Sequence, residues 1–179
     1  MKSNDIILRE LNAVSASFGV TIHPVIDGSL VFEENIHLNC FYCGRYGRNW
    51  RCPPKIPVLD YPKLISEFDN RAFVYRYYKI TPESKEDVRT DSTNHLHKSL
   101  LAMEGVLFKA GNPTALSFIG GSCKLCKSGC GVEYCNNPYE ARMPLEATGM
   151  NIVKTAAKHG IKIDWPVADN MLRLGMLLW

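Results

Sequence analysis

The seven cysteines of this 179-residue chain fall into two short segments. The first segment has the pattern C-x2-C-x8-C-P-P, and the second has the pattern C-x2-C-x3-C-x4-C. Thiolates are ligands for soft metal ions and for iron–sulfur clusters. We therefore predict two cysteine-ligated metal centres. Their ligands are Cys40, Cys43 and Cys52 in site one, and Cys123, Cys126, Cys130 and Cys135 in site two.

The odd number of cysteines argues against a complete set of disulfides. The first eighteen residues mix charged with apolar side chains, so they lack the continuous apolar core of a signal peptide. We expect a cytoplasmic location, where clustered cysteines are more often metal ligands or redox groups than disulfides. No apolar run approaches the ~20 residues of a membrane-spanning helix, so we expect no membrane partner.

The spacing of the thiols favours iron–sulfur clusters over zinc. Zinc sites usually complete their ligand set with a second C-x2-C or a pair of histidines. Site two instead spaces its later thiols by three and four residues, and Pro138 follows closely, as in cluster loops of the bacterial ferredoxin type. We predict two iron–sulfur clusters of the [4Fe–4S] type, with zinc as the alternative.

Glycines and positive charges surround the thiols. Glycine lets the backbone approach a bulky cluster and donate N–H groups to its sulfurs, so we expect these glycines to bind the cofactor. Positive charge lowers the pKa of a thiol and offsets the charge of a thiolate-bound cluster; solvated basic loops are the alternative. The glycines are Gly120, Gly121, Gly129 and Gly131, and the cations are Arg45, Arg48, Arg51, Lys124 and Lys127.

Site one lacks one of the four ligands that a complete centre needs. His37 precedes Cys40 by three residues, in the pattern H-x2-C-x2-C, and is a candidate fourth ligand. Water, a substrate or a group from elsewhere in the fold are alternatives. An open iron would be a Lewis-acid binding position. Arg142 and Glu146 follow site two at i, i+4 spacing, which favours an ion pair on a helix surface over a role beside a cluster.

Length and composition predict one domain, residues 1–179, around these centres. A hydrophobic content of 46% is enough for a sizeable core. We expect an α/β fold with a mixed sheet flanked by helices, and two cysteine-rich loops at residues 37–54 and 120–138. The net charge of +3 is small and dispersed, so nucleic acid is not an expected partner.

Apolar periodicity predicts the elements that position the two loops. From residue 72 the order of strand, helix, strand, cysteine loop, helix and strand indicates a right-handed crossover, with site two at the carboxyl end of a strand. The polar segment 81–92 reads as a loop. We expect helices at 6–18, 60–68, 94–110 and from Pro144 to Gly160, and strands at 29–33, 72–80, 115–119 and 171–179.

Four segments resemble a family of cysteine-rich predicted metal-binding proteins found mainly in anaerobic bacteria and archaea. The family is a domain of unknown function, and the resemblance covers most of the chain. It implies metal binding and an anaerobic setting, and it supplies no established reaction. The segments are Y-G-R-N-W-R-C-P-P at 46–54, G-G-S-C-K-L-C at 120–126, C-N-N-P-Y-E-A-R at 135–142 and E-A-T-G at 146–149.

Three classes of function follow from these observations. The first is an iron–sulfur protein that transfers electrons to or from a redox partner protein. The second is an enzyme in which an open iron of site one binds a small-molecule substrate. The third is a zinc-stabilised interaction module. No Ser/His/Asp set, phosphate-binding glycine loop or H-E-x-x-H motif supports hydrolytic or nucleotide-dependent chemistry.

Overall fold

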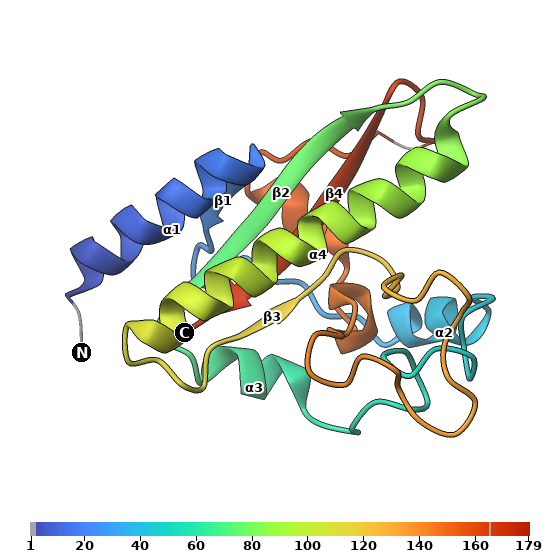
Figure 1. The fold of residues 1–179 in the computed structure, drawn as a ribbon, viewed down its shortest axis with the longest axis horizontal. Helices are drawn as coiled ribbons and strands as arrows, with labels where there is room; N and C mark the ends of the chain where they lie inside the picture. The colour runs from blue at the N-terminus through green and yellow to red at the C-terminus, as the bar shows by residue number, and fades with distance from the viewer. Residues whose placement is uncertain (1–2, 165) are drawn as a thin grey trace.

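The strands of the computed structural model, which describes residues 3–164 and 166–179, form one antiparallel sheet in the order β1-β2-β4-β3 (Figure 1). The strands are β1 (Thr21–Pro24), β2 (Arg71–Lys79), β3 (Leu116–Phe118) and β4 (Asn170–Leu178). The α-helices are α1 (Asn4–Phe18), α2 (Asn35–Phe41), α3 (Tyr61–Ser66), α4 (Lys85–Lys109) and α5 (Ile152–Lys158), and a 3-10 helix, η1, spans Leu145–Thr148.

The last strand, β4, lies between β2 and β3 and is antiparallel to both. The strands β2 and β3 are therefore parallel to each other, and α4 connects them as a split βαβ unit. The predicted α/β class and the order of these elements are confirmed. The strand β4 inserts between β2 and β3, so every pair of neighbouring strands in the sheet is antiparallel.

Alternate residues of the central strands are buried on opposite faces of the sheet. Val74 and Leu177 pack in a core with α1 and α4, whereas Phe73 and Met176 pack in a second core with α3, η1 and α5. The molecule therefore has three layers, with α1 and α4 together on one face (Figure 1). Burial on both faces explains why β4 is a nearly continuous apolar run.

Several predicted helix ends are confirmed. The side chain of Asp60 accepts a hydrogen bond from the backbone N–H of Lys63 at 3.0 Å, and Pro62 lies in the first turn of α3. Gly111 has a φ of 94° immediately after the last residues of α4. That left-handed conformation suits glycine and ends the helix where the sequence predicted.

The predicted loop at residues 81–92 is wrong, because α4 already begins at Lys85. Glu86 and Asp87 lie in its first turn, where negative charge interacts favourably with the helix dipole. Arg89 pairs with Glu86 at 3.6 Å. These first turns are mostly exposed, so they need no apolar face and have the composition of a loop.

The prediction around residues 21–41 also needs correction. Residues 29–33 do not form a strand; only Phe32 makes an isolated bridge, to Met150. The strand in this region is β1, and α2 follows at Asn35–Phe41. A four-residue edge strand and a helix with no fully buried residue give weak periodic signals, so the sequence indicated neither.

The helix predicted from Pro144 to Gly160 is divided into η1 and α5. Gly149 has a φ of 85° and ends η1, and the side chain of Asn151 then caps α5 by accepting from the N–H of Lys154. The interruption changes which residues face inward, so Val153 is exposed rather than buried. Within the described ranges, no helix combines the length and apolar character needed to cross a membrane.

Candidate metal centre

Site one begins on α2 and continues through a series of turns. His37 and Cys40 lie on α2, and Cys43 follows Tyr42, the residue that caps the end of this helix. Cys52 is only 6% exposed, Cys40 is partly buried and Cys43 is exposed. The thiol of Cys52 lies close enough to Cys40 and Cys43 for their charges to act on it. The three predicted ligands therefore lie within electrostatic reach of one another.

Site two occupies the loop that leaves β3. The thiol of Cys123 is within electrostatic reach of Cys126, Cys130 and Cys135, so this set is also gathered. The side-chain amide of Asn137 donates a hydrogen bond to the sulfur of Cys126 at 3.0 Å. All seven cysteines are free thiols.

The glycines predicted around site two allow backbone conformations and close contacts that other residues would not. Gly121 and Gly129 have φ values of 79° and 91°, as their expected conformational freedom requires. Gly120 and Gly131 have other reasons to lack a side chain. A Cβ atom at Gly120 would lie 2.5 Å from the carbonyl oxygen of Leu174, and one at Gly131 would collide with the carbonyl oxygen of Tyr134.

The two sites lie beside each other, joined by three consecutive residues of site one. Asn49 donates from Nδ2 to the carbonyl of Cys123 at 3.0 Å, and Trp50 donates from Nε1 to that of Gly131 at 2.8 Å. Arg51 donates from Nη2 to Pro138 at 2.7 Å. The charge of Cys123 also acts on Cys52. Figure 1 shows α2 and the two loops gathered at one side of the molecule.

The thiols at the centre of this region have raised pKa values. Burial is the main cause for Cys40, Cys52 and Cys123, and for Cys52 it raises the pKa to about 12. Neighbouring thiols add to each of these shifts. The prediction that nearby cations lower the thiol pKa is therefore wrong for these three residues. Arg45 and Arg48 are exposed, so water screens their charge.

A carboxylate that the sequence did not connect with site one is among its neighbours. Glu146, on η1, acts electrostatically on Cys40 and on Cys52. Its oxygen Oε2 accepts a hydrogen bond from the N–H of Gly121 at 3.3 Å. Removal from water raises its pKa, although Arg173 and Lys124 act in the opposite direction.

The expected ion pair between Arg142 and Glu146 does not form. Arg142 lies outside the helices and donates to both carboxylate oxygens of Glu104 on α4, with Nη2 2.5 Å from Oε2. The i, i+4 rule applies only along a continuous α-helix, and this segment turns before η1 begins. Glu146 instead acts electrostatically on the thiols of site one.

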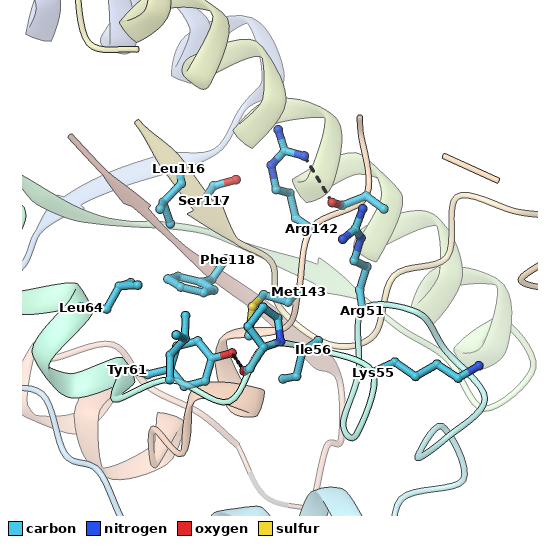
Figure 2. A pocket seen from close by; sticks show the side chains of 13 residues that line it. Arg51, Lys55, Ile56, Tyr61, Leu64, Leu116, Ser117, Phe118, Arg142 and Met143 are labelled. Atoms are coloured by element: carbon cyan, nitrogen blue, oxygen red, sulfur yellow. Dashed lines mark hydrogen bonds between the residues drawn. The ribbon is translucent and has the colours of Figure 1, made fainter. Parts of the chain in front are cut away.

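An apolar pocket of about 290 Å³ lies beside the centres but contains no cysteine in its lining. Figure 2 shows Tyr61, Leu64, Phe118 and Met143 around it. Its two arginines, at positions 51 and 142, bind protein atoms through their guanidinium groups. The pocket therefore offers packing surface and no convergent set of polar groups.

The donor chemistry of the two loops is that of a metal centre. Soft thiols gather in two separate sets. Within the described part of the chain, however, no three His, Cys, Asp or Glu side chains form a group that could hold a metal ion.

Residues 25–179 match the sequence profile of DUF2284, described as a family of predicted metal-binding proteins. The chain belongs to this family. No curated protein and no solved structure matches it. The family description predicts metal binding, and the two groups of free thiols in this DUF2284 chain are consistent with it. The description names neither the metal nor a reaction.

Proposed function

We propose that this protein carries two adjacent iron–sulfur clusters and transfers electrons between them and a redox partner protein. The observation that carries the proposal is the direct hydrogen bonding between the two loops that carry the thiols. Asn49 and Trp50 of site one bind the backbone of site two at Cys123 and Gly131. Two centres held at a fixed, short separation suit the movement of single electrons.

The spacing of the thiols along the chain supports clusters over single zinc ions, because site two lacks the second C-x2-C or histidine pair that is usual for zinc. The thiols of each set also lie within electrostatic reach of one another, although none of the described donors forms a group that could hold a metal ion. A [4Fe–4S] cluster distributes its thiolates over several irons, so its ligands stand farther apart than those of zinc. The proposed cofactors are two [4Fe–4S] clusters, with zinc and a role as an interaction module as the alternative.

The exposure of the thiols supports exchange of electrons with an external partner. Cys43 is exposed, and Cys126, Cys130 and Cys135 are partly exposed. A cluster held by these residues would have an edge near the surface, where a partner's redox centre can approach. In each transfer the partner loses or gains one electron and the cluster gains or loses the same electron. We propose a cytoplasmic setting in anaerobic metabolism.

Electron paramagnetic resonance tests whether the two centres are neighbours. We expect the spectrum of the fully reduced parent protein to be broadened by interaction between the spins of its two clusters. Cys43→Ala and Cys130→Ala should each retain one cluster and give a narrow spectrum. If the parent spectrum equals the sum of the two variant spectra, the centres do not interact and the proposed pathway between them is wrong.

A further inference from the structure

We infer that Glu146 is the fourth protein ligand of site one. The inference rests on the proposed function, because it requires a cluster at the three-cysteine set. It assigns a residue of a different type, from a distant part of the chain, to the position that the cysteine pattern leaves open. A carboxylate among the thiolates would make site one chemically distinct from site two.

The first argument is the way in which α2 packs against η1. The segments that flank these two helices are tied together: Glu33 donates its N–H to Gly149 at 3.0 Å, and Asn151 donates its N–H to Val31 at 2.8 Å. The ring of His37 on α2 closes against Gly149, where a Cβ atom would lie 2.7 Å from Nε2. The two helices therefore face each other directly.

The spacing along the two helices then places the carboxylate beside the thiols. Cys40 follows His37 by three residues, and Glu146 precedes Gly149 by three residues. Residues three apart share a face of a helix. Cys40 and Glu146 are thus placed on the facing sides of the two segments, and the charge of the carboxylate acts on Cys40 and Cys52.

The second argument is that no other group in the described part of the chain holds this carboxylate in an ion pair. The charges of Lys124 and Arg173 act on Glu146, but both cations donate their hydrogen bonds to other atoms. Lys124 donates from Nζ to the carbonyl and hydroxyl oxygens of Ser122 at 3.3 Å. Arg173 donates from Nε to Ser92 at 2.9 Å and from Nη2 to the carbonyl of Arg89 at 3.1 Å.

Glu146 therefore has acceptor capacity that its protein neighbours do not use. Its side chain accepts from two backbone N–H groups, that of Glu146 itself and that of Gly121, and the bond from Gly121 is long at 3.3 Å. A partly buried carboxylate needs compensation for its lost hydration. An iron of site one supplies that compensation, whereas His37 is exposed and its ring is directed at Gly149.

The test compares four variants with the parent after anaerobic preparation. Glu146→Gln keeps the side-chain volume and the acceptor for Gly121 but removes the anionic ligand, and Glu146→Cys substitutes a thiolate. His37→Ala tests the rival ligand. Glu140→Gln is the matched control, because its side chain is exposed and close in sequence. Iron and acid-labile sulfide are measured, and cyanide is the probe for an open iron.

We expect the parent, Glu140→Gln and His37→Ala to carry two clusters that are insensitive to cyanide. Glu146→Gln should respond to cyanide at one cluster only, or lose about half of its iron. Glu146→Cys should retain both clusters and remain insensitive. A parent without sulfide would overturn the proposed function. A parent with two clusters and an identical Glu146→Gln variant would overturn this inference alone.

Discussion

At the scale of single residues, Asn49 holds the two candidate centres together. It is only 4% exposed, and its amide uses both ends. The Nδ2 group donates to the carbonyl of Cys123 at 3.0 Å, and Oδ1 accepts from the N–H of Arg51 at 2.9 Å. One buried side chain thus orders the segment before Cys52 and fixes it to the start of site two.

Asn49→Ala should therefore weaken both the fold and the link between the sites. Loss of the amide leaves a partly buried carbonyl and a partly buried N–H without their partner, which costs about 1–3 kcal/mol. We expect the free energy of unfolding of the cluster-loaded protein to fall by about that amount, measured by anaerobic denaturation. Asn12→Ala, at an exposed position of α1, is the control and should change it by less than about 0.5 kcal/mol. If both substitutions change the free energy of unfolding equally, Asn49 does not hold the two sites together.

The sequence led us to predict that the cysteines are metal ligands, but it did not indicate which residues hold the two cysteine loops in place. Thiols in two compact patterns indicate metal ligands because few other uses of cysteine give such spacing. Asn49 and Glu146 carry no comparable pattern, and their roles depend on which distant groups they meet. The i, i+4 interpretation of Glu146 failed because the local helix it assumed does not exist.

At the scale of elements, the junction between β3 and site two depends on close passage beside β4. The chain leaves β3 after Phe118, and Gly120 crosses the backbone of Leu174. A side chain at Gly120 would collide with main-chain atoms of a central strand. This passage brings the cysteine loop directly against the sheet.

Gly120→Ala should consequently be destabilising. The new Cβ atom would lie 2.5 Å from the carbonyl oxygen of Leu174, so the loop or β4 must shift. Overpacking of this kind costs about 1–3 kcal/mol. Thermal unfolding monitored by circular dichroism should show a lower midpoint, together with a changed absorption spectrum of the clusters.

The matched control for this substitution is Gly105→Ala on α4. A Cβ atom there meets no atom within 4 Å, and alanine is favoured over glycine inside a helix by about 1 kcal/mol. We expect the control to leave the midpoint unchanged or raise it. A midpoint that falls equally for both variants would mean that the close passage at Gly120 does not matter to stability.

Apolar periodicity predicted the elements that pack in the core and missed those that do not. The strands β2 and β4 and the inner half of α4 bury their side chains, so their patterns are clear. The polar first turns of α4 and the whole of α2 lie mainly at the surface. The fold holds them in place through neighbouring contacts that leave no periodic signal in the sequence.

At the scale of the whole molecule, the covered sheet leaves the cysteine loops together at one side. Helices cover both faces of the sheet, and α2 and the two loops gather outside these layers (Figure 1). Three hydrogen bonds to backbone carbonyls join loops that are about 80 residues apart in sequence. A backbone carbonyl is present at every residue, so sequence alone did not predict that the two sites are neighbours.

The most direct test of the account is the iron and acid-labile sulfide content of anaerobically purified protein. We expect a brown protein that bleaches on reduction and carries up to about eight irons and as many sulfides per chain. Removing site two with Cys130→Ala should halve both values. Stoichiometric zinc without sulfide in the parent protein would contradict the two-cluster account.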